Sequence, residues 1–256
     1  MRKINTAIML NFISLAAVLV VNFLAVNLPL NNLTTKQISD SFDIYFVPAG
    51  YVFSIWGFIY LALITFSIYR ALPKNRENEK FARVDAWFVA ANACNVLWLV
   101  SFHYQQFLLA LMFMFILLIV LINIFEKLEI GKRKPDLAWR WAVEVPFSVY
   151  LGWITVATIA NVTQVLDFVG WNGFGISEEI WFLVVVAAVV IISAVMSITR
   201  RAFEYVLVLV WALVGIAVKF PDVPLVNYSA WGGAIAITVI DMLALITASN
   251  PSQKKN

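Results

Sequence analysis

Three tryptophans lie inside long apolar segments, and each has aromatic or amide residues near it at helical spacing. Residues three, four or seven positions apart share one face of an α-helix. Each segment therefore presents a face that combines an indole with phenol, phenyl or amide groups, and such broad aromatic faces suit a flat, largely apolar ligand. The residues on these faces are Phe53, Trp56 and Tyr60; Asn92, Asn95, Trp98 and Phe102; and Tyr150, Trp153, Ala157 and Asn161.

Two interpretations of these faces stay open on spacing alone. A buried amide such as that of Asn95 or Asn161 needs a partner inside a membrane, so it faces either protein or a polar cavity. The faces are then the walls of a ligand pocket, or they are aromatic helix packing with amide hydrogen bonds between helices.

Two carboxylates also fall inside apolar segments, where an acid costs on the order of 2.5 to 3.5 kcal/mol at the bilayer centre. Glu144 lies four residues after Arg140 and near a segment end, which favours an interfacial or ion-paired carboxylate. Asp241 has no basic residue one helical turn away. Proton coupling by Asp241, or by Glu144, is therefore the alternative chemistry that the sequence offers.

The counts of cysteine and histidine exclude several kinds of chemistry. Cys94 is the single cysteine and His103 the single histidine. A disulfide framework, a multi-cysteine metal site, a bis-histidine haem and a histidine cluster each need more of these residues. Because no nucleophile, general base or metal set stands out either, we expect no catalytic residues, no metal and no cofactor, and a protein that is not an enzyme.

The elements that carry the aromatic faces are predicted to be membrane-spanning helices. Of the 256 residues, 62% are hydrophobic and 13% charged, against about 45–50% and 25% in soluble domains. Eight apolar runs have about the length that crosses a bilayer. The sequence predicts an all-α, multi-pass membrane protein with about eight transmembrane helices, at residues 4–28, 46–72, 84–103, 107–125, 137–166, 180–198, 203–220 and 230–247.

The basic residues predict the orientation of these helices. With eight spans, 16 of the 18 Lys and Arg residues fall on one side and only Lys36 and Lys219 on the other. By the positive-inside rule, both termini are then cytoplasmic in a cell membrane. The net charge of +3 thus reflects topology, and no nucleic-acid partner is expected. The basic side contains Arg2, Lys3, Arg70, Lys74, Arg76, Lys80, Arg83, Lys127, Lys132, Arg133, Lys134, Arg140, Arg200, Arg201, Lys254 and Lys255.

Two further features leave alternatives open. The polar connection over residues 27–47 is long for a turn between helices, so it is either a lid over a site or a short amphipathic surface helix. Ala86, Ala90 and Cys94 form a row of small residues that lets two helices approach closely, either within the chain or in a homodimer.

Three motifs resemble the TspO/MBR family, the tryptophan-rich sensory or translocator proteins. They are PAGYVFSIWGFIY at residues 48–60, NVLWLVSF at residues 95–102 and YLGWITVATIAN at residues 150–161. The residues that match the family pattern position for position are Trp56, Tyr60, Asn95, Trp98, Tyr150, Trp153, Ala157 and Asn161.

The resemblance implies a five-helix membrane core over residues 1–166, followed by three additional helices and a short tail over residues 167–256. It also implies that the eight matched residues bind a flat lipophilic ligand beneath the loop between the first two spans. A tetrapyrrole, a sterol-like or a carotenoid-like molecule is the expected kind of ligand, and sensing, transport or regulation the expected role. A porphyrin-degrading activity, attributed to parts of the family, is a further implication, and a proton-coupled carrier that uses Asp241 is the alternative function.

Overall fold

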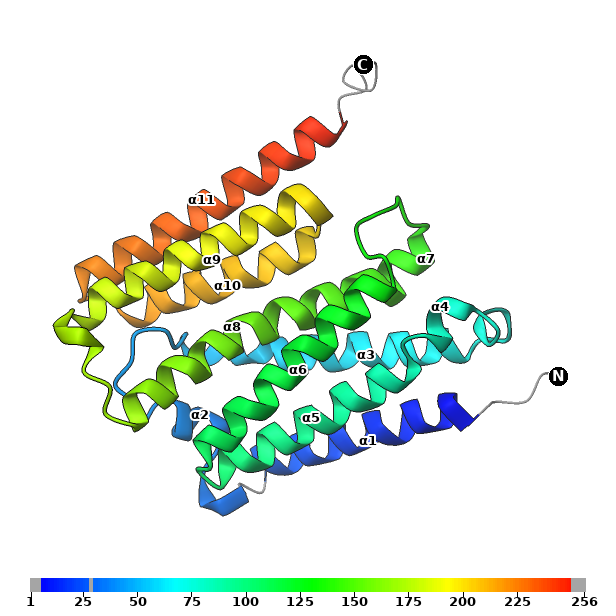
Figure 1. Ribbon diagram of the computed structural model, residues 1–256, viewed down its shortest axis with the longest axis horizontal. Helices are drawn as coiled ribbons and strands as arrows, with labels where there is room; N and C mark the ends of the chain where they lie inside the picture. Colours follow the sequence, from blue (N-terminus) through cyan, green and yellow to red (C-terminus); the bar gives the residue numbers. More distant parts are fainter. Residues whose placement is uncertain (1–5, 28–29, 250–256) are drawn as a thin grey trace.

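The structure is a bundle of eight long helices joined by short helical turns (Figure 1). It is a computed structural model that describes residues 6–27 and 30–249. Every regular element of these residues is helical. The long helices are α1 Thr6–Asn27, α3 Ile55–Ala71, α5 Asp85–His103, α6 Phe107–Lys127, α8 Val145–Phe168, α9 Glu178–Arg200, α10 Phe203–Lys219 and α11 Pro224–Ser249. The short ones are η1 Leu30–Asn32, α2 Thr35–Ser39, η2 Gly50–Ser54, η3 Pro73–Asn75, α4 Glu79–Ala82, α7 Leu137–Trp139, the π-helical η4 Arg140–Glu144 and η5 Gly173–Gly175.

Seven segments of the described residues are long and apolar enough to cross a membrane, which confirms the predicted all-α, multi-pass class. The eighth long helix, α10, has 17 residues and covers about 25 Å at 1.5 Å per residue. This is slightly less than the roughly 30 Å thickness of a bilayer core. Since α10 lies beside α8, α9 and α11 (Figure 1), it completes the bundle as an eighth antiparallel helix.

Successive long helices alternate in direction, so α1 begins and α11 ends at the same end of the bundle (Figure 1). That end also carries α4 and α7, and we call it the basic end because most of the lysines and arginines of the described residues lie there. The opposite end carries η1, α2 and the α8–α9 connection. We call residues 30–40, which contain η1, α2 and its C-cap, the lid, and this end of the bundle the lid end.

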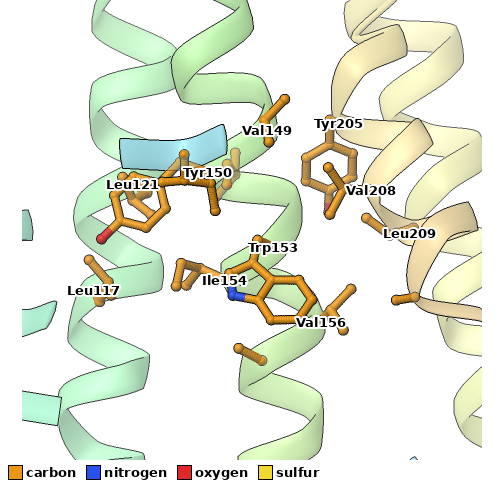
Figure 2. Packing of buried hydrophobic residues seen from close by; sticks show 14 of the residues in the cluster. Leu117, Leu121, Val149, Tyr150, Trp153, Ile154, Val156, Tyr205, Val208 and Leu209 are labelled. Carbon is orange, nitrogen blue, oxygen red and sulfur yellow. The ribbon is translucent and has the colours of Figure 1, made fainter. Parts of the chain in front are cut away.

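Helix α8 is the central element of the bundle. In its most apolar window 89% of the residues are buried, against 28% in α1, α9 and α11. Figure 2 shows why: α8 packs against α6 through residues such as Tyr150 and against α10 through Val149 and its neighbours. The last three helices therefore cover a face of α8 that would otherwise be exposed to lipid.

Gly152 permits the close packing of α8 against α10. A Cβ atom at this position would lie 2.8 Å from the backbone oxygen of Tyr205 and 3.1 Å from Val208 Cβ. Helices in membranes associate largely through such close packing, since lipid supplies no hydrophobic force between them. The absence of a side chain at residue 152 thus brings the two helix backbones together.

A π-helical segment precedes α8 and accommodates a proline. Pro146 has no backbone N–H and would clash with the carbonyl four residues earlier in a regular helix. The segment Arg140–Glu144 lies in the preceding turn, where π geometry changes the hydrogen-bond register. One continuous span, Leu137–Phe168, results.

The outer surface of the bundle is apolar along its length. Large hydrophobic side chains on α1, α6, α9 and α11 are exposed, including Phe23, Ile119, Ile191 and Ile235. A monomeric soluble protein rarely exposes so wide an apolar surface. The lipid bilayer is therefore the environment of these helices.

The loop over residues 27–47 contains the short helix α2, and this helix covers the lid end of the core. Thr34 caps α2 through a reciprocal pair of hydrogen bonds with Gln37. Ile38 and Ser39 are buried, so α2 is seated on the bundle rather than extended over its surface.

Two basic-end residues have partners that the sequence did not indicate. Arg70, which the topology prediction counted with the basic side, lies in the last turn of α3 with 1% of its surface exposed. Of the two interpretations of Glu144, the ion pair with Arg140 is not formed: Arg140 pairs with Glu204, and the Glu144 carboxylate accepts a backbone hydrogen bond from Gly131. The cause is the same in both cases, since spacing along a single helix does not show which neighbouring helix approaches it.

Candidate functional site

The three predicted aromatic faces meet around Trp56. Its ring stacks on Tyr60 at a centroid distance of 5.6 Å and on Trp98 at 6.1 Å. Tyr150 and Trp153 meet it edge-on, each at 6.2 Å. Offset-stacked and edge-to-face pairs are the favoured arrangements of aromatic rings. Helices α3, α5 and α8 therefore contribute to one aromatic cluster near the lid end.

Asn161 joins two of these helices through its amide group. Its Oδ1 accepts a hydrogen bond from Trp98 Nε1 at 3.0 Å, and its Nδ2 donates to the backbone oxygen of Ala157 at 3.0 Å. The interhelical amide bond that the packing interpretation requires is thus present.

Asn95 has a similar structural role deeper in the bundle. Its Nδ2 donates to the Tyr150 hydroxyl at 3.2 Å, and its Oδ1 accepts from Asn22 Nδ2 of α1 at 3.1 Å. Asn92 donates to Ser14 Oγ, also on α1, at 3.0 Å. The polar residues of α5 therefore connect α1 and α8 to it.

A small cavity of about 40 Å³ lies between this cluster and the lid. Five of the eight predicted site residues line it, whereas Tyr60, Asn95 and Tyr150 lie beneath it and support the lining rings. Drug-sized ligands need pockets of roughly 300–1,000 Å³, so the cavity is closed to a large ring system. Its walls are Thr35, Ser39, Val47, Pro48, Phe53, Trp56, Trp98, Phe102, Trp153, Val156, Ala157, Ala160, Asn161 and Gln164.

Two polar atoms of the cavity walls are buried without a hydrogen-bond partner. They are the indole Nε1 of Trp153 and the amide Oε1 of Gln164. Both residues are 3% exposed. An unsatisfied buried donor or acceptor costs about 1–3 kcal/mol, so each of these atoms suits a polar partner of its own, such as a water molecule or a polar group of a ligand.

Gln164 and Ser39 are site residues that the sequence interpretation missed. Gln164 Nε2 donates to Ser39 Oγ of α2 at 3.4 Å, a long hydrogen bond between α8 and the lid. Helical spacing could have identified Gln164, because it follows Asn161 by three residues on the same helical face. Nothing in the sequence indicated Ser39, because its position depends on how the loop folds back.

His103 anchors the lid from the end of α5. Its Nδ1 lies 3.2 Å from the backbone oxygen of Leu30, and its Nε2 lies 2.9 Å from Thr35 Oγ1. A carbonyl oxygen only accepts, so in the neutral imidazole Nδ1 carries the proton and Nε2 accepts from the Thr35 hydroxyl. The sequence used this histidine only to exclude metal sites, and the structure gives it a positioning role.

The remaining candidate, Asp241, lies away from this cluster on α11. It is 4% exposed, and its Oδ1 accepts a hydrogen bond from Ser197 Oγ of α9 at 2.6 Å. The proton-coupling residues of the alternative hypothesis, Asp241 and Glu144, are therefore not part of the aromatic site. Among residues 6–27 and 30–249, no group of three or more His, Cys, Asp or Glu side chains is placed to hold a metal ion.

Fold and site together define a multi-pass helical membrane protein with a tryptophan-rich cluster under a lid. A family model described as TSPO-like protein matches residues 8–243. The chain therefore belongs to this family, which confirms the resemblance, and the match extends through α9, α10 and most of α11. Comparison with curated proteins and with solved structures gave no match.

Proposed function

We propose that the protein binds a flat lipophilic ligand in the cavity between Trp56, Trp98, Trp153 and the lid, for sensing, transport or regulation. The observation that carries the proposal is the pair of buried, unpartnered polar atoms, Trp153 Nε1 and Gln164 Oε1. The two residues are about three helical turns apart on α8, so a ligand with an acceptor near Trp153 and a donor near Gln164 satisfies both atoms, while its flat body stacks on the surrounding indoles.

Binding requires the closed cavity to widen, and the lid is the element whose contacts are easiest to exchange. Its links to the bundle include the long Ser39–Gln164 hydrogen bond and the Thr35–His103 hydrogen bond. Both are side-chain contacts that water or a ligand replaces at a modest net cost of about 0.5–1.5 kcal/mol each. By contrast, widening by separation of α5 from α8 breaks the buried Trp98–Asn161 hydrogen bond.

Tetrapyrroles, sterols and carotenoids are the ligand classes to test, because each combines a large apolar body with few polar groups or none. A carotenoid hydrocarbon leaves Trp153 Nε1 and Gln164 Oε1 unsatisfied, whereas a sterol-like alcohol provides a partner for one of them and a tetrapyrrole with several polar groups provides partners for both. The cavity walls supply stacking, apolar contact and hydrogen bonds, which are the means of binding rather than of bond cleavage, and we therefore propose a binding protein.

The test is a titration of the purified full-length protein with protoporphyrin, cholesterol and β-carotene, followed by tryptophan quenching and by competition. Trp153→Phe keeps a ring but removes the N–H, and Gln164→Met keeps the volume but removes the amide. Loss of one ligand hydrogen bond weakens binding by roughly threefold to tenfold.

Trp231→Phe is the matched control, since Trp231 lies on α11 and is 41% exposed. The proposal requires that this variant binds like the parent protein while both cavity variants bind less tightly. Equal affinity in all three variants, or no saturable binding by the parent protein, contradicts it.

A further inference from the structure

A second and much larger cavity, of about 560 Å³, opens at the lid end between the core and the first turns of α9. Its walls come from the segment before η2, the end of α8, the α8–α9 connection and the first turns of α9, which all lie at the same end of the bundle (Figure 1). It shares no lining residue with the 40 Å³ cavity of the core. Its volume falls within the roughly 300–1,000 Å³ range of small-molecule pockets.

Aromatic rings form a large part of this second cavity. Trp171 and Trp181 meet at a centroid distance of 5.1 Å and an interplanar angle of 56°. Phe46 and Phe182 add a second ring pair at 6.3 Å. Trp181 Nε1 already donates to the backbone oxygen of Gly173 at 2.9 Å, so its ring is held in place and offers its face rather than its N–H.

Three carboxylates complete the lining, and no lining residue is basic. They are Asp43, Asp167 and Glu178, from three different segments, and all three are exposed. Within the part of the chain that the structure describes, none of the three forms an ion pair. The cavity therefore combines aromatic walls with an uncompensated negative charge.

The spacing of these acids distinguishes between an inorganic and an organic cation. They are not placed to hold a metal ion together, as no described group of three such side chains is. Carboxylates that lie around a cavity without a shared coordination point attract a cationic group by charge and leave its apolar body to contact the walls. Aromatic faces add cation–π attraction for an ammonium group, which is the usual mode of recognition of quaternary ammonium ligands.

An anionic ligand does not fit this cavity. The N-terminus of α9 would favour an anion, but Glu178 and Glu179 already occupy its first turn. Glu179 also accepts a hydrogen bond from the Tyr45 hydroxyl at 3.4 Å. A second negative charge would meet like charges on each side of the cavity.

We propose that this cavity binds a lipophilic organic cation, an amine or quaternary ammonium with an apolar body. The apolar body lies against Trp171, Trp181 and Phe182, and the charged group lies among Asp43, Asp167 and Glu178. The site is separate from the cavity of the proposed function and depends on different residues.

The experiment measures binding of tetraphenylphosphonium to the purified full-length protein, with tetraphenylborate as the anion of the same shape. The cation is expected to bind saturably, and the anion is expected not to bind. Trp171→Ala should weaken cation binding by roughly twofold to thirtyfold, the range of a cation–π contact. The double variant Asp167→Asn, Glu178→Gln should weaken it by roughly fivefold or more and reduce its salt dependence.

Matched controls decide whether the effect belongs to this cavity. Asp222→Asn removes an exposed carboxylate from the α10–α11 turn, which does not line the cavity, and Trp231→Ala removes an exposed indole from α11. Both should bind the cation like the parent protein. The proposal is overturned if the anion binds as tightly as the cation, or if the cavity variants bind the cation as tightly as the controls. It is also overturned if Trp153→Phe, a change in the other cavity, loses cation binding while the variants of this cavity keep it.

A choline headgroup carries the same chemistry as a free organic cation, and a competition experiment separates these sources. Phosphatidylcholine is added to the protein in nanodiscs of phosphatidylglycerol that contain bound tetraphenylphosphonium. If phosphatidylcholine displaces tetraphenylphosphonium from the parent protein but not from the cavity variants, the cavity binds a lipid headgroup. Retention of the probe assigns it to a free solute.

Discussion

Arg70 and Asp85 form a two-point ion pair inside the basic end of the bundle. Arg70 Nε donates to Asp85 Oδ1 at 3.1 Å, and Nη2 donates to Oδ2 at 2.8 Å. Asn11 Nδ2 of α1 also donates to Oδ1, at 2.7 Å, and the guanidinium lies 5.6 Å from the centre of the Phe81 ring. The pair therefore ties α1, α3 and α5 together at the end opposite the lid.

The first prediction concerns the cost of breaking this pair. Asp85→Asn leaves the buried Arg70 charge without a counter-charge, so the free energy of unfolding should fall by about 3–5 kcal/mol. The double variant Arg70→Met, Asp85→Leu should recover most of that loss, because both charges are then absent. Unfolding in detergent mixtures measures both effects.

The exposed pair of Arg83 and Glu79 serves as the control for this prediction. Its side chains are 65% and 85% exposed, so Arg83→Ala should change the free energy of unfolding by less than about 1 kcal/mol. A similarly small effect of Asp85→Asn would mean that water reaches Arg70.

The sequence predicted the helical faces of the core well, but not the contacts that complete them. Helical spacing and the motif match place Trp56, Trp98 and Trp153 on three helices, and the rings do meet. The partners Asn22 and Gln164 come from other elements or from one turn further along the helix. Sequence spacing shows which residues share a face, whereas the pairing of two faces depends on helix packing.

The buried Arg70 and the size of the core cavity were unpredictable for different reasons. A hydropathy window treats an arginine near a helix end as solvated, and Asp85, which neutralises Arg70, lies fifteen positions away across a turn. The cavity volume depends on side-chain conformations, since rings that stack on one another, as Trp56 and Trp98 do, fill the space that a ligand would need.

A second prediction concerns Asn161, which supplies the acceptor for the Trp98 indole N–H. Asn161→Ala leaves that donor buried and unpaired, so the free energy of unfolding should fall by about 1–3 kcal/mol. In a Trp98→Phe background the donor is already absent, and Asn161→Ala should then cost clearly less. Asn123→Ala is the control, since Asn123 bonds only a backbone oxygen of its own helix. Equal costs in the two backgrounds would show that the two side chains are not coupled.

A third prediction is a pH dependence of the lid. Partial burial opposes ionisation of Asp40, but hydrogen bonds and ion pairs with Lys219 and Lys36 hold the pKa of this carboxyl below its ordinary value of 3.8. A depressed pKa in the folded state means that the stabilisation is present above about pH 4 and is lost as the pH falls through the lower value. The contact fastens the lid to α10, since Lys219 Nζ lies 3.0 Å from Asp40 Oδ1.

Hydrogen exchange of the α2 amides measures this effect. Exchange should rise when the pH falls below about 4, after correction for the intrinsic rate, and Asp40→Asn should raise it at neutral pH and remove the acid-dependent change. Because both partners are partly exposed, the stabilisation is at most about 1 kcal/mol. Lys36 and Lys219 are also the two basic residues that lay on the acidic side in the topology prediction, and both pair with this one carboxylate. Unchanged exchange of the α2 amides in the Asp40→Asn protein would show that the contacts of Asp40 do not stabilise the lid.

The fourth prediction separates the structural role of Asp241 from the carrier hypothesis. Asparagine keeps the oxygen that accepts from Ser197, so Asp241→Asn should change the free energy of unfolding by less than about 1.5 kcal/mol. If Asp241 couples protons to transport, the same variant must lose uptake driven by a pH gradient in proteoliposomes. Ser197→Ala, which keeps the carboxylate, is the companion variant. Unchanged uptake in the folded Asp241→Asn protein contradicts the carrier hypothesis.

The last prediction is the membrane topology, and α10 decides it. Cys94→Ala provides a cysteine-free background, into which single cysteines are placed at Phe174, in the α8–α9 connection, at Arg133, in the α6–α7 connection, and at Asp222, in the α10–α11 turn. The basic end should face the cytoplasm by the positive-inside rule. A membrane-impermeant maleimide should therefore label residues 174 and 222 in intact cells, and residue 133 only after permeabilisation.

If the 17-residue α10 did not cross the bilayer, residue 222 would lie on the cytoplasmic side together with residue 133. Labelling of residue 174 but not of residue 222 would thus reduce the protein to seven spans, and labelling of residue 133 alone would reverse its orientation.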